Sequence, residues 1–292
     1  MNTILYRPIH YAAEDDRRQI DALYQKVFHL NFSIKSNIWS QPARNPLGIL
    51  ATDADTGAAV GHFTSSAFRA KIGNAIIPFR ISMGFMTDAA YRGQGIAAQL
   101  YFHLRNAILE AQDAQFIIGF PNDVSYHMHL NRMEYDLHRD YQFVVLPRGD
   151  SIHSYKKYTG DFSETCFGSS SQNNQLEHSA SYMNWRYQNP NYDRWQSESG
   201  HIFITVKFQH KIDILYWSEA VSPEELFDFS SFLYHTTDAD KVTTWNSLDA
   251  LNAYPKERRN YHMCINYLIC SPAEKQAIQN NWLFWMGDCE LF

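Results

Sequence analysis

The chain has 292 residues and a net charge of −6, with 45% hydrophobic, 15% aromatic and 19% charged residues. This balance is typical of a globular protein and excludes an intrinsically disordered chain. No apolar run approaches the ~20 residues of a membrane-spanning helix, and the first eleven residues lack the apolar core of a secretory signal. We therefore expect a soluble, cytoplasmic protein without a membrane span.

Charge and cysteine content exclude further classes. The longest basic run is Lys256–Arg259, so the chain lacks the electrostatic footprint of a nucleic-acid-binding protein, while a cationic amine substrate is compatible with its charge. The four cysteines lie in the second half without a C-x-x-C pair, which argues against a zinc site and a disulfide framework. The H-E-x-x-H and G-x-S-x-G motifs of zinc and serine hydrolases are missing.

Periodicity predicts alternating helices and strands in the first half. After an acidic first turn, apolar residues recur at helical spacing from Ile20 to Phe28, which predicts an opening helix over 14–30. The elements predicted after it are strands 48–52, 58–67, 68–72 and 75–86, with turns at 53–57 and 73–74, then a helix over 95–113, a strand over 115–120, a helix over 123–133 and a strand over 138–146.

The second half begins with a polar stretch over 149–181, predicted to be a linker or surface loop that is least structured at 169–175. Strands at 201–209 and 211–218, a helix starting at Ser222 and strands near 242–245, 261–270 and 282–286 follow. This order repeats that of the first half. We therefore expect two domains, 1–148 and 149–292.

One loop has the pattern of a diphosphate cradle. A β-prone segment runs into Gly93 and Gly95, and from Ile96 apolar residues recur every four positions, so a helix starts near Gly95. The start of a helix presents unpaired backbone N–H groups and a partial positive charge, and the glycines let a diphosphate approach the backbone closely. Arg92 adds a fixed positive charge. A plain tight turn is the structural alternative.

Arg92-Gly93-Gln94-Gly95-Ile96-Ala97 resembles the R-x-x-G-x-G/A signature of the GNAT superfamily of acyl-CoA-dependent N-acyltransferases. The run Met86–Gly93 resembles the M-T-x-P-x-Y-R-G motif of a bacterial subgroup associated with surface-polysaccharide biosynthesis, with Ala89 in place of the usual proline. Phe116–Asn122, with its G-F-P-N ending, and Trp39 with Asn45–Gly48 also resemble this subgroup. The resemblance covers residues 1 to about 147 well and the remainder loosely.

The resemblance implies an α/β (α+β) GNAT fold, in which helices flank a central mixed, mostly antiparallel sheet, followed by a second, degenerate GNAT-like domain. The second half lacks the cradle motif, so we expect it to shape the acceptor pocket. The implied activity is transfer of an acetyl or other acyl group from acetyl-CoA, as co-substrate and without a metal, to a primary amine of a small molecule. A nucleotide-linked amino sugar is the preferred acceptor, and the protein is expected to be a monomer or homodimer.

The resemblance also implies how the cofactor is bound. The backbone of Phe85–Thr87 would pair with pantetheine, and the N–H groups of Gly93–Ala97 with the pyrophosphate. Asn122 would bond pantetheine or a water, or cap the next helix. The implied cofactor-binding residues are Phe85, Met86, Thr87, Arg92, Gly93, Gln94, Gly95, Ile96, Ala97 and Asn122.

Three residues are candidates for catalysis. Tyr126 is the tyrosine nearest to the family's usual thiolate acid, although it is also explained as a packing residue. His129 can carry a proton near neutral pH, and His127, two residues away, points to another face. Glu134 replaces the glycine that usually closes this helix and is a candidate general base or a solvated carboxylate.

Two alternative functions keep the fold. A non-catalytic acyl-CoA-binding protein would retain the cradle without turnover. An aminoacyl-tRNA-dependent transferase of related fold would replace the donor, but the cradle motif and the lack of a basic surface argue against it.

Overall fold

The computed structural model describes residues 3–29, 33, 42–167, 173–280 and 282–289. The chain packs into two compact units. Unit 1 combines Met1–Ala70, Ile76–Arg139 and His262–Gln276, and unit 2 combines Lys71–Ala75, Asp140–Tyr261 and Ala277–Phe292. Late in the sequence the chain thus returns to unit 1. The functional boundary at residue 148 stays a prediction, and Trp39 lies outside the described residues.

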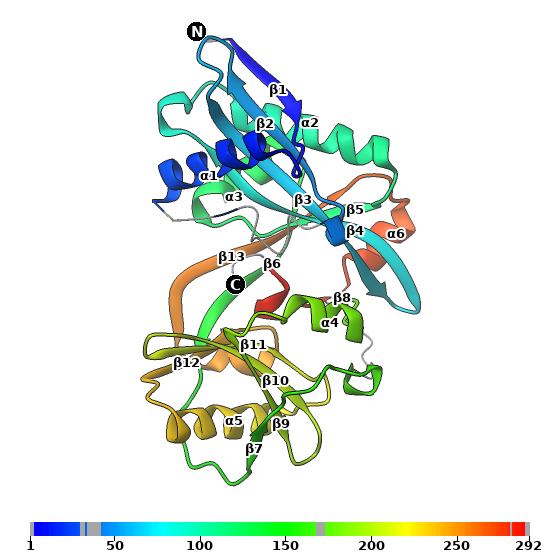
Figure 1. Cartoon of the computed structure of the whole chain (residues 1–292). Coiled ribbons are helices and arrows are strands. Elements are labelled where there is room, and N and C mark those ends of the chain that lie inside the picture. Colours follow the sequence, from blue (N-terminus) through cyan, green and yellow to red (C-terminus); the bar gives the residue numbers. More distant parts are fainter. Residues whose placement is uncertain (1–2, 30–32, 34–41, 168–172, 281, 290–292) are drawn as a thin grey trace. The chain divides into compact units, whose positions relative to one another are not determined.

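Unit 1 is built on a mixed sheet with the strand order β1-β2-β3-β4-β5-β13 (Figure 1). β4 and β5 are parallel, whereas β1 with β2, β2 with β3, and β5 with β13 are antiparallel. The strands are β1 (Ile4–Pro8), β2 (Leu47–Asp53), β3 (Ala59–Ile72), β4 (Ala75–Thr87), β5 (Phe116–Gly119) and β13 (Lys256–Tyr267), the last from residue 262 on. The helices are α1 (Glu14–Phe28), α2 (Ile96–Ala111), α3 (Asp123–Arg132) and most of α6 (Pro272–Ile278), with short 3-10 turns η2 (Pro42–Arg44) and η3 (Ala89–Tyr91).

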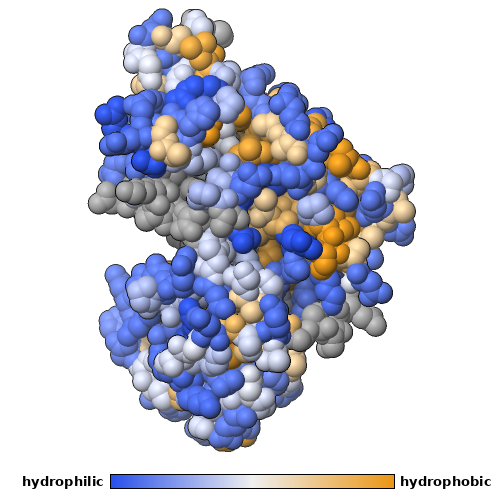
Figure 2. Space-filling model, turned by 45° about the vertical axis from the view of Figure 1, so that its right-hand side comes forward, coloured by the Kyte–Doolittle hydropathy of each residue, from blue (hydrophilic) through white to orange (hydrophobic). Residues whose placement is uncertain are grey.

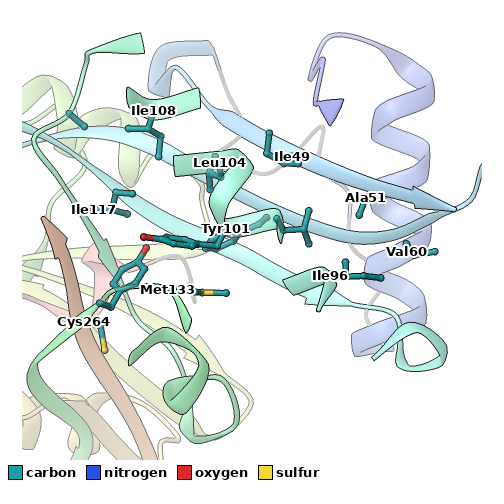
Figure 3. Packing of buried hydrophobic residues seen from close by; sticks show 14 residues of the cluster. Ile49, Ala51, Val60, Ile96, Tyr101, Leu104, Ile108, Ile117, Met133 and Cys264 are labelled. Atoms are coloured by element: carbon teal, nitrogen blue, oxygen red, sulfur yellow. The ribbon is translucent and has the colours of Figure 1, made fainter. Parts of the chain in front are cut away.

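Helices cover both faces of this sheet because successive strand residues point to opposite sides. In β2, Ile49 packs in the cluster that contains the buried face of α2, whereas Leu50 packs in the cluster that contains α1. Figure 3 shows the α2 side, where Tyr101 and Leu104 point toward the strands. The four-residue spacing in the sequence therefore predicts the buried stripe of α2 correctly.

The strands of unit 2 follow the order β6-β12-β11-β10-β9-β7. Along this order β11 and β12 are parallel, whereas β6 with β12, β10 with β11, β9 with β10 and β7 with β9 are antiparallel. The strands are β6 (Asp136–Val145, from residue 140 on), β7 (Tyr155–Lys157), β9 (Tyr192–Ser197), β10 (Ile202–Phe208), β11 (Lys211–Trp217) and β12 (Lys241–Trp245); β8 (Asn174–Leu176) pairs with β14 (Trp282–Leu283). The helices are α4 (Ala180–Arg186) and α5 (Pro223–Thr236), with 3-10 turns η4 (Glu164–Phe167), η5 (Asp249–Ala253) and η6 (Met286–Asp288).

Both units contain the same order of elements. In unit 1, β2, β3 and β4 are neighbours, α2 crosses over, and β5 pairs parallel to β4. In unit 2, β9, β10 and β11 are neighbours, α5 crosses over, and β12 pairs parallel to β11. Parallel neighbours need such a crossover connection. The mixed, mostly antiparallel sheets confirm the predicted fold class, and the repeated order supports a GNAT-like second half.

Several predicted elements need correction. Ala59–Ile72 forms one continuous strand where the sequence predicts 58–67 and 68–72, because no turn-forming residue separates the two segments. The stretch 149–181, predicted to be a linker, contains β7, β8 and the start of α4. β1, β9 and α6 are also absent from the predicted elements. None of these missed elements exceeds seven residues, which is too short for a clear periodic pattern.

The face of the molecule seen in Figure 2 is mostly polar. Hydrophilic residues cover most of the face seen in Figure 2, and hydrophobic residues form separate patches on it. Within the described ranges, the helices are all too short or too polar to span a membrane.

Candidate functional site

β4 and β5 pair in parallel, and β4 continues beyond the end of β5. The pairing runs from Arg80 with Ile117 to Ser82 with Gly119, where β5 ends, and β4 extends to Thr87. Beyond Ser82, the backbone groups of β4 on this side therefore do not pair with β5. This is where pantetheine is predicted to pair. The side chain of Phe85 packs, partly buried, against the α2 cluster, and that of Met86 is buried in the α1 cluster.

Gly84 bends β4 just after it leaves β5. Its φ is +60°, and a Cβ there would lie 2.7 Å from the Tyr24 hydroxyl and 3.0 Å from His62 Cε1, so only glycine fits. The Nδ1–H of His62 donates to the Gly84 carbonyl at 2.7 Å. Burial lowers the pKa of His62 to about 4, and the imidazole is therefore neutral at pH 7.

The loop between β4 and α2 has an open, left-handed backbone. Gly93 and Gly95 have φ values of +80° and +77°, which side chains rarely adopt. A Cβ at either position would meet nothing within 4 Å, so the space in front of the backbone is open. Gly95 is the N-cap of α2 and supplies no side-chain cap. This geometry fits a diphosphate held by the first N–H groups of the helix.

The charges around the start of α2 also suit an anion. Its first turn carries no acidic residue, and the helix dipole contributes a partial positive charge. Arg92 is exposed beside the loop, and its Nε–H donates to the Thr87 carbonyl at 3.4 Å, which holds the guanidinium next to the cradle. Gln94 is exposed, Ile96 is buried in the α2 cluster and Ala97 is partly buried, so these three can contribute through their backbones.

The equivalent position in unit 2 has the opposite character. α5 begins with Ser222 as N-cap, whose hydroxyl accepts from the Glu225 N–H, and its first turn carries Glu224 and Glu225. A cavity of about 850 Å³ at this end of α5 is also lined by Asp150, Glu198 and Asp228, among other residues. Carboxylates and a side-chain cap occupy the place that a diphosphate would need. Of the two crossover helices, only α2 therefore starts with an anion-binding geometry.

One ion pair and one hydrogen bond anchor the cradle loop to neighbouring elements. The carboxylate of Asp88 accepts from the Ala90 N–H at 3.1 Å and from the Lys26 ammonium of α1. Burial alone would raise the pKa of Asp88, but these bonds outweigh it and leave the pKa lowered. The Tyr91 hydroxyl donates to Asp53 at 2.8 Å. The loop is thus fixed to α1 through Asp88 and to the β2–β3 turn through Tyr91.

Asn122 is the N-cap of α3. Its Oδ1 accepts from the N–H groups of Val124 and Ser125, both at 3.1 Å, which confirms the capping role. Only the oxygen serves as the cap, so the side-chain amide is compatible with the predicted pantetheine contact as well. That contact stays a prediction.

Tyr126 lies on the first turns of α3 and stacks on a residue from the far end of the sequence. Its ring centroid is 4.0 Å from that of His262, with an interplanar angle of 29°. His262 Nε2 lies 2.9 Å from Asp123 Oδ1. Tyr126 also packs against the α2 cluster. The structure therefore brings the predicted tyrosine together with a histidine and a carboxylate that the sequence analysis does not single out.

His129 and His127 point to different faces, as predicted. His127 is exposed, whereas His129 is buried, with its ring 5.8 Å from Phe85 and 5.1 Å from Tyr135. His129 Nδ1 hydrogen-bonds the Ser125 carbonyl at 2.9 Å, and burial lowers the pKa of His129. A lowered pKa keeps this imidazole neutral near pH 7.

Glu134 follows the C-terminal end of α3. It is the left-handed residue of this turn, with a φ of +57°, and its carboxylate is exposed and lies 3.5 Å from Arg105 Nε. Glu134 is thus a solvated carboxylate at the end of the helix, the second of its two predicted roles. The catalytic roles of Tyr126, His129 and Glu134 stay predictions.

Sequence reasoning misses His62 and His262. Neither belongs to a motif, and His262 reaches α3 only because β13 pairs with β5, Cys264 lying opposite Gly119. Among the described residues, no group of three or more His, Cys, Asp and Glu could hold a metal ion.

No family model and no curated protein matches the sequence. Solved structures do match the fold. A GCN5-related N-acetyltransferase from Kribbella flavida is 11% identical with a TM-score of 0.64, over 91% of this chain and 72% of that one. One from Anabaena variabilis is 14% identical with a TM-score of 0.62, over 91% and 73%. The N-myristoyltransferase of Saccharomyces cerevisiae with bound myristoyl-CoA is 7% identical with a TM-score of 0.61, over 97% and 89%. At these identities the chain shares the fold of these N-acyltransferases.

Proposed function

We propose, from the fold it shares with these N-acyltransferases, that the protein transfers an acyl group from acyl-CoA to a primary amine. The observation that carries the proposal is the start of α2. There Gly93 and Gly95 hold a left-handed backbone with open space in front of it, next to Arg92 and without an acidic residue. The start of α5 is the internal contrast, because it has a side-chain cap and two glutamates in its first turn.

The donor is proposed to lie along two elements. The diphosphate binds the N–H groups of Gly93–Ala97 and the Arg92 guanidinium, where the helix dipole and a first turn of α2 without acidic residues favour it. Pantetheine runs beside the backbone of Phe85–Thr87, where β4 has left β5. The side-chain amide of Asn122, at the start of α3, contacts this arm. When bound, the thioester supplies an activated acyl carbon.

The acceptor amine attacks that carbon, and the sulfur leaves as a thiolate that needs a proton. We assign the proton donor to Tyr126, on the first turns of α3. His129 and Glu134 remain candidates for other proton transfers. The buried His129 lies beside Phe85 of β4, whereas Glu134 lies at the opposite end of α3 from Asn122.

We propose acetyl-CoA as the donor and the amine of an amino sugar, nucleotide-linked or free, as the acceptor. The net charge of −6 is compatible with a cationic amine. The amino sugar itself rests on the resemblance of Met86–Gly93 to the polysaccharide-associated subgroup.

The first experiment is a thermal-shift titration with acetyl-CoA on wild type, Gly95→Ala and Gly200→Ala. Gly200 is the matched control, because it also has a left-handed φ, of +90°, and no neighbour within 4 Å of a Cβ, but lies in a turn of unit 2. A ligand that binds only the folded state stabilises it by about 2.7 kcal/mol at a hundred times its Kd. We expect wild type and Gly200→Ala to be stabilised and Gly95→Ala to lose the shift.

An unshifted wild type, or an equal shift in Gly95→Ala, would contradict the cradle assignment. Release of CoA thiol with a panel of amino sugars and other amines then separates an enzyme from a non-catalytic acyl-CoA-binding protein. The binding protein would show the shift without thiol release.

A further inference from the structure

The proposed donor leads toward the point where β5 ends. With the diphosphate at Gly93–Ala97 and pantetheine beside Phe85–Thr87, the arm runs backwards along β4. Its thioester end therefore points toward Ser82 and Gly119, the last paired residues of β4 and β5. The side chains around this pair decide how long an acyl chain the site admits.

A tyrosine lies across the end of this strand pair. The Tyr135 hydroxyl donates to Ser82 Oγ at 3.2 Å, and Ser82 Oγ donates to the Ile118 carbonyl at 3.4 Å. A Cβ at Gly119 would lie 3.4 Å from Tyr135 Cε1 and 3.6 Å from His129 Cδ2. Both side chains are buried, and they lie directly over the end of β5.

Tyr135 belongs to an aromatic wall, which consists of Phe85, His129 and Tyr135. The ring centroid of His129 is 5.8 Å from that of Phe85 and 5.1 Å from that of Tyr135. Asn266 of β13 fixes the turn before Tyr135, because its side-chain amide donates to the carbonyls of the two preceding residues at 3.2 and 2.7 Å. A packed and hydrogen-bonded group of this kind makes room for additional atoms only at a cost in strain.

The other face of β4 is occupied as well. A Cβ at Gly84 would lie 2.7 Å from the Tyr24 hydroxyl and 3.0 Å from His62 Cε1. His62 is completely buried, and Tyr24 comes from α1. Side chains therefore lie against β4 on its α1 side and on its α3 side. An acyl chain that follows β4 past Gly84 meets them on either face.

We propose that the aromatic wall restricts the donor to short acyl groups and that Tyr135 sets this limit. The inference rests on the proposed function and adds the residue that selects its acyl group. An acetyl group ends directly beyond the thioester carbon, whereas a longer chain must displace a buried ring that is hydrogen-bonded to β4. In a hydrophobic pocket, one methylene too many costs about 10- to 200-fold. The substrates selected in this way are acetyl-CoA and its nearest homologues.

The first test uses the full-length wild type with the best amine found in the thiol-release assay. Acetyl-CoA, butyryl-CoA and hexanoyl-CoA are compared by kcat/KM. We expect hexanoyl-CoA to react about 100-fold less well than acetyl-CoA, with butyryl-CoA between them. Hexanoyl-CoA that reacts within about threefold of acetyl-CoA would overturn the inference and leave the proposed function standing. A wild type that no acyl-CoA stabilises, or that binds acyl-CoA without thiol release, would overturn the proposed function, and the inference with it.

The second test asks whether Tyr135 sets the limit. Tyr135→Ala removes the ring and should raise the hexanoyl-to-acetyl ratio of kcat/KM by about tenfold or more. Tyr135→Phe loses only the hydroxyl and should keep the ratio near that of wild type. Tyr141→Ala removes a similarly buried tyrosine from unit 2 and is the matched control.

The ratio separates selection from stability. A purely structural role of Tyr135 would lower kcat/KM for both donors and keep their ratio, as expected for Tyr141→Ala. An unchanged ratio in folded Tyr135→Ala would therefore overturn the assignment of Tyr135. If that variant does not fold, Tyr135→Leu, which loses less volume, takes its place and should shift the ratio in the same direction.

Discussion

The hydroxyl of Tyr91 donates a hydrogen bond of 2.8 Å to the carboxylate of Asp53, which is completely buried. The other oxygen of Asp53 accepts from the N–H groups of Asp55 and Thr56. One carboxylate thus organises the β2–β3 turn and holds the residue that precedes Arg92. The conformation of the proposed cradle loop therefore depends on Asp53, nearly forty positions upstream of Tyr91.

Replacing Tyr91 by Phe removes one donor from the buried Asp53 carboxylate. We expect the free energy of unfolding to fall by about 1.5–3 kcal/mol, since hydrogen bonds to charged groups contribute about this much. The acetyl-CoA Kd should rise as well, because the cradle loop loses an anchor. Chemical denaturation and a thermal-shift titration measure the two effects. Tyr158→Phe, which removes an exposed bond to the Asp161 carbonyl, is the control, and equal losses in both variants would refute a special role for the Tyr91 bond.

The Lys26–Asp88 pair is expected to act on cofactor affinity through charge. Without Lys26, the buried Asp88 loses its ion-pair partner and keeps a negative charge a few residues from the diphosphate site. Lys26→Met should therefore raise the acetyl-CoA Kd by roughly two- to fivefold at low salt, and Lys26→Arg should not. The double variant Lys26→Met/Asp88→Asn should restore the wild-type Kd. If the double variant binds no better than Lys26→Met, the effect is structural and not electrostatic.

Because His62 is buried and neutral in the folded protein, we expect the protein to lose stability in acid. Burial lowers its folded pKa to about 4, below the 6.5 of an unperturbed histidine, so the unfolded chain binds the proton more readily. The stabilising contribution is complete above pH ~6.5 and is lost as the pH falls toward 4, by about 2 kcal/mol between pH 7 and pH 5. In His62→Asn, whose amide can still donate to Gly84, this difference should shrink by that amount. Denaturation at both pH values checks it, with His127→Asn as the control that should keep the wild-type difference.

Substitution of Glu134 by glycine is expected to stabilise the folded protein. Its φ of +57° is unfavourable for a residue with a Cβ, by about 1 kcal/mol, while its ion pair with Arg105 is long and partly exposed. Glu134→Gly should therefore raise the free energy of unfolding by somewhat less than about 1 kcal/mol. Arg132→Gly, within α3, should lower it by a similar amount. A loss of stability in Glu134→Gly would mean that the Arg105 contact outweighs the backbone strain.

Elements with long periodic patterns could be predicted from the sequence. α2 and its cradle follow from the four-residue apolar spacing after two glycines, and α5 follows from Ser222 and the acidic turn after it. Short elements such as α4 and β9 could not, because six or seven residues contain at most two turns of a helix or three side chains per strand face.

The site was predictable only where it is local in sequence. Gly93, Gly95 and the Asn122 cap lie within motifs, and their backbone conformations follow from residue type. The pairing of His262 with Asp123 depends on which strand lies beside β5, and a single sequence carries no local signal for that choice. The burial of His62 likewise depends on Gly84 and α1 packing around it.

The return of β13 to unit 1 has a consequence for biosynthesis. When β5 emerges from the ribosome, only one of its two neighbouring strands, β4, has been synthesised. The other neighbour, β13, is among the last strands to be made. Until Cys264 and its neighbours emerge, the completely buried strand β5 has an open, apolar edge of the kind that invites aggregation. We therefore expect nascent chains that stop near residue 148 to depend on chaperones and to be cleared by proteases, whereas the finished chain closes this edge by itself.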